Sequence, residues 1–166
     1  MSREELNVLV LCTGNSARSI LGEVLINELG EGRLKAFSAG SQPVGQVNPR
    51  AIDKLEREGH DLSELESKSW DRFSGPGAPD IDIVITVCDN AAGESCPIWN
   101  GAPVTAHWGI PDPASAGDPG PAFDAAYAAL RARVEALLQV PLADFDSRQR
   151  YDALARIHDS FIDHTG

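Results

Sequence analysis

Residues 7–19 read NVLVLCTGNSARS, and this stretch decides the fold. Its first part, Asn7–Cys12, is a short and almost continuous apolar run, which is typical of a strand buried on both faces of a parallel sheet. Residues 13–16 then have the composition of a tight loop. Over 17–29 the apolar residues recur at the spacing of one helix face, and Gly30 is a natural stop. The sequence therefore predicts a strand, a tight loop and a helix in that order.

The same alternation of strands and helices continues along the chain. Further strands are predicted at 35–39, 81–87 and 103–107, and further helices over 49–58, 67–73, 123–138 and 151–161. Residues 108–121 are rich in Gly and Pro and are predicted to form a long loop. Strands that alternate with helices imply a parallel sheet with right-handed crossovers.

Two cysteines end predicted strands. Cys12 follows the first strand and Cys88 follows the third. Ligands of open parallel sheets bind at the carboxyl ends of the strands. If these two strands are neighbours, both thiols face one crevice.

Length and charge restrict the class of protein. A chain of 166 residues suits one domain with a proper core. The formal net charge is −11 and no Lys/Arg cluster occurs, so we expect neither nucleic acid nor an anionic membrane as a partner. No apolar run is long enough for a membrane span, and the acidic start of the chain does not resemble a signal peptide. We therefore expect a cytoplasmic protein.

The loop after the first strand has the residues needed for oxyanion chemistry. Unpaired amides at a helix N-terminus point at one spot, and Arg18 can contact two oxygens of a tetrahedral anion. Gly14 permits tight backbone geometry, and Asn15 tolerates a left-handed conformation. The same amides and cation would favour the thiolate form of Cys12. The simpler alternative is a buried strand-end cysteine and a surface arginine.

Residues 12–19 resemble the phosphate loop of low-molecular-weight protein tyrosine phosphatases and of the thiol-dependent arsenate reductases that share their fold. The resemblance extends to residues 38–40, to the Asn48-Pro49 pair and to the Asp112-Pro113 pair, and it covers about residues 6–138. It implies a three-layer α/β sandwich with a central four-stranded parallel sheet in the flavodoxin-like order 2-1-3-4.

The resemblance also implies roles for individual residues. Cys12 is then the nucleophile, Ser19 hydrogen-bonds it, and Asp112 is the general acid. The substrate-binding residues implied by the loop are Thr13, Gly14, Asn15, Ser16, Ala17 and Arg18. Without the resemblance, an Asp-Pro pair is more often a turn.

Two features favour the reductase branch of the resemblance. The phosphatases typically have tyrosine directly after the Asp-Pro pair, whereas Ala114 stands there in this chain. The reductases have two further cysteines after the third strand, and Cys88 and Cys96 match them. A low-molecular-weight protein tyrosine phosphatase, which hydrolyses phosphomonoesters through a phosphocysteine, is the alternative. A phosphocysteine carrier or a thiol-based redox sensor is the non-catalytic alternative.

The reductase resemblance implies a relay of thiols that detoxifies arsenic. Cys12 attacks arsenate, Cys88 then forms a disulfide with Cys12, and Cys96 transfers that disulfide to the Cys88–Cys96 pair. The resemblance implies arsenate as substrate, phosphate or sulfate as competing anions, and no bound cofactor. Thioredoxin is the favoured external thiol reductant, ahead of glutaredoxin with glutathione and mycothiol-type donors.

The sequence contains two candidate cation sites, one for a metal ion and one for potassium. Cys88, Cys96 and His107 are candidate metal ligands, but the spacing of the two cysteines is not that of zinc sites, and we expect no metal. Several related reductases bind potassium beside the loop through residues that match Asn15, Glu23 and Ser38 plus an acidic residue. This chain has Lys68 at the acidic position. We hypothesise that its ammonium stands in for the ion, and the alternative is a solvated surface charge.

The resemblance does not reach the end of the chain. We therefore divide the sequence into a catalytic domain, residues 1–141, and a C-terminal helical extension, residues 142–166.

Overall fold

The computed structural model describes residues 5–15, 17–30, 32–60, 65–73, 76–87, 103–110 and 118–161. Its strands are β1 (Leu6–Cys12), β2 (Leu34–Gly40), β3 (Ile83–Thr86) and β4 (Val104–His107). Its α-helices are α1 (Arg18–Leu29), α2 (Pro49–Arg57), α4 (Pro119–Leu137) and α5 (Ser147–Phe161), with short 3-10 helices η1 (Trp70–Phe73) and η3 (Leu142–Asp144).

The four strands form one parallel sheet in the order β2-β1-β3-β4, which confirms the predicted topology. In the register of this sheet Cys12 is paired with Gly40, and Leu11 is paired with Thr86. The carboxyl ends of β1, β2 and β3 therefore meet at one edge, and Cys12 lies in the middle of that edge.

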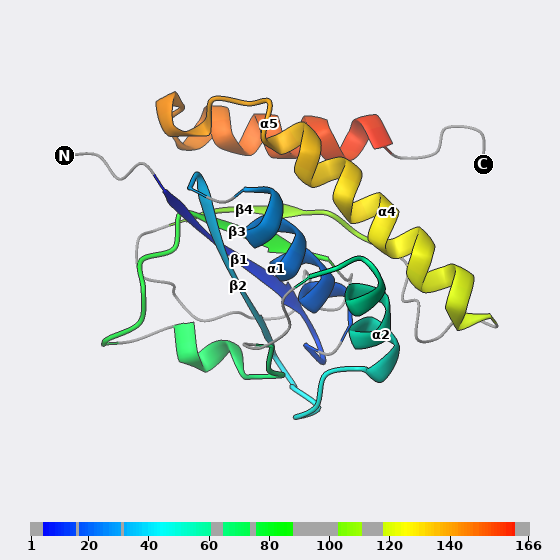
Figure 1. Cartoon of the computed structure of the whole chain (residues 1–166). Helices are drawn as coiled ribbons and strands as arrows, with labels where there is room; N and C mark the ends of the chain where they lie inside the picture. The colour runs from blue at the N-terminus through cyan, green and yellow to red at the C-terminus, as the bar shows by residue number, and fades with distance from the viewer. Residues whose placement is uncertain are drawn as a thin grey trace.

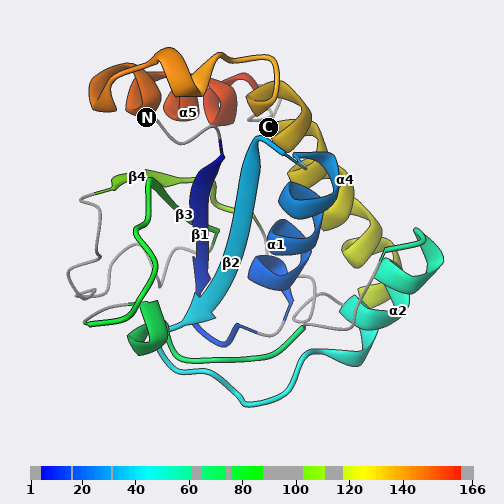
Figure 2. The same cartoon turned by 60° about the vertical axis from the view of Figure 1, so that its left-hand side comes forward.

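Alternate residues of β1 pack on opposite faces of the sheet, as the two-residue period of a strand requires. Val8 and Val10 belong to the main core with α1 and α4, whereas Leu9 and Leu11 pack with Phe73 of η1 on the other face. Figure 2 shows α1, α2 and α4 on one side of the sheet and η1 on the other. The layers are those of the predicted three-layer sandwich.

The boundaries of some elements differ from those predicted. The helix that contains the apolar positions of 123–138 begins at Pro119, inside the predicted loop, because proline is well suited to the first turn of a helix. The third strand is shorter than predicted, although Ile81 and Val87 at its two ends are still buried. The helix predicted near residue 70 is a single 3-10 turn.

The predicted last helix is present as α5, and it packs on β4 and α4. Leu154 and Ile157 are buried in the main core, and the indole nitrogen of Trp108 donates a 3.0 Å hydrogen bond to the Leu154 carbonyl. Tyr151 and Phe161, in the same helix, are exposed. In Figure 1 α5 lies across the top of the molecule, away from the carboxyl ends of β1 and β2. The division of the chain at residue 141 stays a prediction.

No helix within the described ranges combines the length and the apolar character that a membrane span requires.

Candidate active site

Cys12 is the last residue of β1, and it is buried with 4% of its surface exposed. The backbone N–H of Asn15 donates to its Sγ at 3.2 Å, and Ser19 Oγ lies 2.9 Å from the same sulfur. Ser19 itself is fully buried in the first turn of α1. Hydrogen-bond donors around a sulfur favour its anionic form. Ser19 and Cys12 thus make the contact that the resemblance implies, and the role of Cys12 as nucleophile stays a prediction.

Asn15 is the residue on which the loop turns. It is fully buried and has a left-handed backbone conformation, with φ of 47°, as its residue type allowed. Its side-chain Nδ2 donates to Ser19 Oγ at 2.8 Å and to Ser38 Oγ at 3.0 Å. Its Oδ1 accepts a 2.8 Å hydrogen bond from the backbone N–H of Lys68. One side chain therefore joins α1, β2 and the segment before η1.

The carbonyl groups of the loop are held by outside donors. Thr13 O accepts from the Gln42 N–H at 2.9 Å, and Gly14 O accepts from the Val44 N–H at 3.1 Å and from Ser67 Oγ at 3.0 Å. In a trans peptide the N–H points opposite to the C=O. The amides that follow these carbonyls therefore point to the other side, and the Asn15 N–H indeed meets the sulfur. This arrangement makes a concave set of donors suited to an anion.

Gly40, at the end of β2, is a residue whose function the sequence analysis did not specify. A Cβ atom at this position would lie 2.4 Å from Thr13 O and 3.0 Å from both Asn15 N and Cys12 O. Such distances to backbone atoms are not tolerated, so only glycine lets β2 approach the loop this closely.

Arg18 begins α1, and its Nη1 donates a 2.9 Å hydrogen bond to the carbonyl of Ile110. Ile110 N in turn donates to Val87 O at 3.0 Å, and Val87 N donates to Leu11 O at 2.9 Å. Segments that precede residues 88 and 111 are thus tied to the end of β1. The guanidinium of Arg18 is placed at the same edge as Cys12, although it is hydrogen-bonded to the backbone here.

A buried ion pair lies behind the loop. Lys68 Nζ is 3.6 Å from Glu23 Oε1, and both side chains are about nine-tenths buried, with 10% and 11% exposed. Ser38 Oγ donates to the same carboxylate oxygen at 2.5 Å. Burial raises the pKa of Glu23 above its usual range, although the Lys68 ammonium and the Ser38 hydroxyl act in the opposite direction. The alternative that Lys68 is a solvated surface charge is therefore wrong.

Several predicted site residues lie outside the described residues: Ser16, Cys88, Cys96 and Asp112. Their roles stay predictions. Ala17, the remaining substrate-binding candidate, is buried directly before α1. No group of three or more His, Cys, Asp or Glu side chains placed to hold a metal ion occurs in the part of the chain that the structure describes. His107, the third ligand of the metal alternative, pairs through Nδ1 with Thr86 Oγ1 at 2.7 Å.

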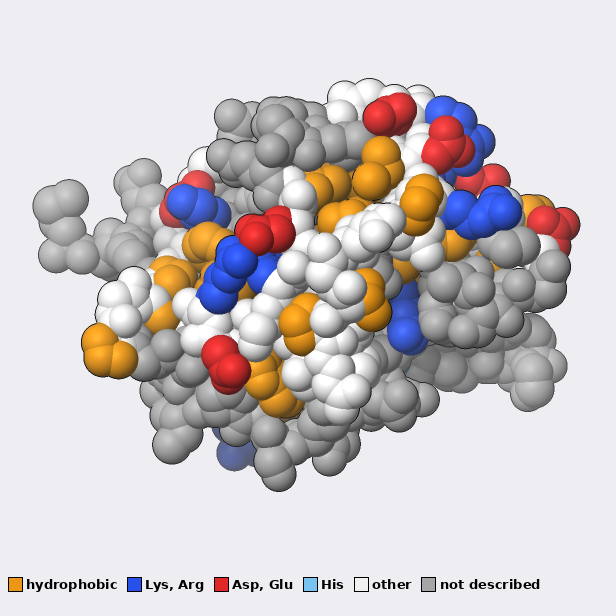
Figure 3. Space-filling model, turned by 90° about the horizontal axis from the view of Figure 1, so that it is seen from below, with side chains coloured by type: hydrophobic (Ala, Val, Ile, Leu, Met, Phe, Trp, Pro, Cys, Tyr) orange, Lys and Arg blue, Asp and Glu red, His pale blue; other side chains and the backbone are white. Residues whose placement is uncertain are grey.

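Among the described residues, the surface at this end of the molecule carries charged side chains of both signs (Figure 3). Figure 3 views it from the side to which β1 and β2 point, and basic, acidic and hydrophobic side chains are interspersed among the described residues. A groove of about 500 Å³ lies between the segment after β2 and residues 65–67, beside the donors that hold Gly14.

Comparison with known proteins agrees with this geometry. The family model described as low molecular weight phosphotyrosine protein phosphatase matches residues 7–148. The chain belongs to this family, and the resemblance inferred from the sequence is confirmed.

Several curated relatives are named arsenate reductase. The one from Bacillus licheniformis is 36% identical over 113 residues, which cover 66% of this chain and 75% of the relative. The one from Staphylococcus aureus strain N315 is 37% identical over 108 residues, which cover 64% and 78%.

Solved structures show the same fold. An arsenate reductase in its phosphate-binding state superimposes with a TM-score of 0.68 at 28% identity, over 81% of this chain and 97% of that one. A low-molecular-weight protein tyrosine phosphatase from T. tengcongensis gives a TM-score of 0.66 at 23% identity, over 81% and 98%. Both branches of the family thus share this architecture.

Proposed function

We propose that this chain reduces arsenate to arsenite, with Cys12 as nucleophile. The observation that carries the proposal is the donor set around Cys12 Sγ, which suits a thiolate that attacks a bound oxyanion. The branch of the family follows from the relatives named arsenate reductase at 36–37% identity, whereas the solved tyrosine phosphatase is 23% identical and supports the fold alone.

The first step joins arsenic to sulfur. Arsenate enters the concave loop, and Arg18 exchanges the Ile110 carbonyl for two arsenate oxygens. The Cys12 thiolate then forms a bond to arsenic. The bond from arsenic to one oxygen breaks, and Asp112 supplies the proton with which that oxygen leaves as water.

The second step reduces arsenic. The thiolate of Cys88 attacks Cys12 Sγ, so the sulfur–arsenic bond breaks and its electron pair stays on arsenic, which leaves as arsenite. Two thiols are thereby oxidised to a Cys12–Cys88 disulfide while arsenic gains two electrons. Cys96 then attacks Cys88, which frees Cys12 as a thiolate and leaves a Cys88–Cys96 disulfide.

An external dithiol must reduce this last disulfide. We propose a thioredoxin-type protein, because the relay ends in a protein disulfide, with glutaredoxin and glutathione as the alternative donor. Such a cycle fits the reducing cytoplasm, where thiols are regenerated.

The test is arsenate-dependent NADPH consumption with thioredoxin and thioredoxin reductase. We expect turnover by the wild type and none by Cys12→Ser, Cys88→Ser or Cys96→Ser. Arg18→Lys keeps the charge but cannot form the two-pronged contact, so we expect a raised KM for arsenate.

The second candidate function is phosphomonoester hydrolysis, because the same loop accepts phosphate and arsenate alike. If the wild type is inactive with every thiol donor, yet hydrolyses an aryl phosphate with only Cys12, Arg18 and Asp112 required, the protein is a phosphatase. Weak phosphatase activity beside arsenate turnover would not contradict the reductase.

A further inference from the structure

Lys68 stands at the outer end of a continuous chain of polar contacts that ends at Cys12. Its ammonium faces the Glu23 carboxylate, the carboxylate accepts from Ser38, and Ser38 accepts from Asn15. The path from Lys68 to the sulfur is completed by Ser19, which contacts both Asn15 Nδ2 and Cys12 Sγ.

The main chain of Lys68 fixes the same path from a second side. Its N–H donates to Asn15 Oδ1 at 2.8 Å, and its carbonyl accepts from Gly40 N at 2.9 Å. Because Asn15 Oδ1 is thereby identified as the acceptor, the other end of the amide must be the donor. Both serines next to Nδ2 therefore use an oxygen lone pair to receive it.

The direction of the remaining protons then follows. Ser19 Oγ accepts from Asn15, so its own O–H is available to donate to Cys12 Sγ. Ser38 Oγ also accepts from Asn15, so its own O–H donates to Glu23. This pattern requires Glu23 to be an acceptor, which is the role of an ionised carboxylate.

The ionisation of Glu23 depends on its neighbour. Burial raises the pKa of this carboxyl, and the Lys68 ammonium is the largest influence in the opposite direction. A protonated Glu23 would have an O–H of its own to donate, and it would then compete with Asn15 Nδ2 for the acceptor lone pairs of Ser38 Oγ. The hydrogen bond between Ser38 and Glu23 could then run in the opposite direction.

We propose that Lys68 is a positioning residue for Cys12. Its N–H fixes the donor end of the Asn15 amide, and its ammonium keeps Glu23 ionised, so that Ser38 stays an acceptor for Asn15 Nδ2 and Ser19 stays a donor to the sulfur. The proposal rests on the proposed role of Cys12 as nucleophile, but it does not depend on which oxyanion is the substrate.

The experiment uses the full chain with Cys88→Ser and Cys96→Ser, so that Cys12 is the only thiol. The fraction of Cys12 present as thiolate is measured from its ultraviolet absorbance as a function of pH, with a variant that also contains Cys12→Ser as the blank. We expect Lys68→Met to lower the thiolate fraction about three- to tenfold, measured at a pH at which most of the wild-type thiol is still protonated, because there each unit by which the midpoint rises lowers that fraction about tenfold. Lys68→Arg should restore most of it.

Arg72→Met is the matched control. Arg72 also pairs with a glutamate, Glu66, through two contacts of 2.7 Å, but its side chain is 54% exposed. Lys68 Nζ reaches this pair only at the Glu66 main-chain carbonyl, at 3.0 Å, and Arg72→Met leaves that carbonyl in place. This variant removes the same charge from the same part of the chain and should leave the thiolate fraction unchanged. If Lys68→Met and Arg72→Met lowered the thiolate fraction equally, the effect would come from the loss of any nearby positive charge, and the proposal would be overturned.

Glu23→Gln, alone and with Lys68→Met, guards against a variant that fails to fold. The double variant leaves no unpaired buried charge, so it should stay folded. If the two residues act through one path, the double variant loses no more thiolate than the larger single variant. Additive losses, or no loss in any variant, would overturn the proposal. None of these readouts needs arsenate, so failure of the arsenate assay alone would leave this inference standing.

Discussion

Two regions at opposite ends of the molecule each bury a cation, and they differ in what faces it. Behind the Cys12 loop, Lys68 faces the carboxylate of Glu23. Between α4 and α5, Arg133 is 5% exposed, and its Nε donates to His158 Nδ1 at 3.2 Å. No carboxylate forms an ion pair with Arg133 among the residues the structure describes.

Because the two buried cations have different partners, a change at each should affect a different property of the protein. The charges at the loop compensate one another and are connected to the nucleophile, so their effect should appear in the chemistry of Cys12. The cation under α5 requires a neutral imidazole, because a protonated His158 would lose its acceptor and add a like charge. Its effect should appear in stability and in its dependence on pH.

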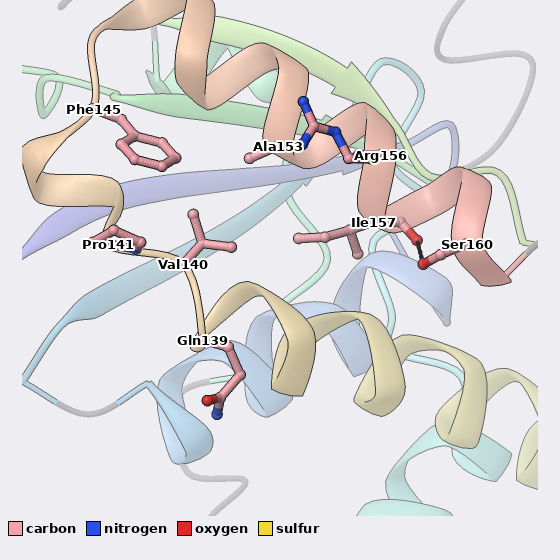
Figure 4. Close-up of a pocket in the computed structure, with 8 residues that line it drawn as sticks. All are labelled: Gln139, Val140, Pro141, Phe145, Ala153, Arg156, Ile157 and Ser160. Atoms are coloured by element: carbon pink, nitrogen blue, oxygen red, sulfur yellow. Dashed lines mark hydrogen bonds between the residues drawn. The ribbon is translucent and has the colours of Figure 1, made fainter.

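The region around α5 also has a groove of its own, apart from the Cys12 loop. A groove of about 410 Å³ lies where the end of α4, the following turn and α5 meet, and Val140, Pro141, Phe145 and Ile157 give it a largely apolar wall (Figure 4). The figure shows Ser160 at its edge, hydrogen-bonded to the carbonyl of its own helix at Ile157. None of the residues that line this groove contacts the Cys12 loop.

The largest expected effect is at the loop. Gly40→Ala places a methyl group 2.4 Å from Thr13 O, so β2 and the loop must separate. We expect arsenate turnover to fall about 100-fold, since a displacement of about 1 Å at a reacting group has that effect. The free energy of unfolding should fall by about 2 kcal/mol. Gly120→Ala, in the first turn of α4 with only a 3.9 Å contact, is the control and should change neither quantity appreciably.

The next effect belongs to α5. Leu154→Ala removes a fully buried side chain from the main core, and we expect a loss of about 3 kcal/mol in the free energy of unfolding by denaturant. Tyr151→Ala on the exposed face should stay within about 0.5 kcal/mol. The thiolate fraction of Cys12 should be the same in both variants. A change in that fraction on Leu154→Ala would show that the two regions are coupled.

A smaller effect is expected on the pH dependence of stability, and it arises from His158 in the region around α5. Burial, followed by the charge of Arg133, lowers the pKa of His158 below its usual value of 6.5. The unfolded chain therefore binds this proton first as pH falls, so stability is fully present above pH 6.5 and declines below it. Thermal unfolding as a function of pH should show this decline in the wild type and a weaker one in His158→Asn.

Glu23 should show the opposite sign. Its pKa is raised above the usual 4.5, so stability from this residue is present below pH 4.5 and is lost as pH rises through the raised value. Glu23→Gln should remove that loss in the same unfolding series. A Glu23→Gln variant with the same pH dependence as the wild type would contradict the buried, strained character of this carboxyl.

The smallest effect concerns dissolved cations. Because the Lys68 ammonium already faces Glu23, we expect the same rate of arsenate turnover in potassium and in sodium at equal ionic strength. A rate that rises strongly with potassium would show that the ammonium does not stand in for an ion. Lys68→Met is the informative partner, since it opens the position that an ion could occupy.

The sequence by itself determined the elements and the local chemistry of the loop. The order of strands and helices, the cap at Asn48 and the left-handed turn at Asn15 depend on residues only a few positions apart. Periodicity and residue type record such relationships directly. The boundaries differ from those predicted at the start of α4, where a proline occupies the first turn, and at the two ends of β3.

Only the tertiary structure decided which distant groups meet the loop. Arg18 pairs with Ile110, Lys68 with Glu23, and the missing Cβ of Gly40 leaves room for Thr13 O. These contacts depend on strand order and register, which bring together segments that share no local pattern. The packing of α5 on β4 and α4 is a contact of the same kind, since the pattern of an amphipathic helix shows that one face is buried but not what covers it.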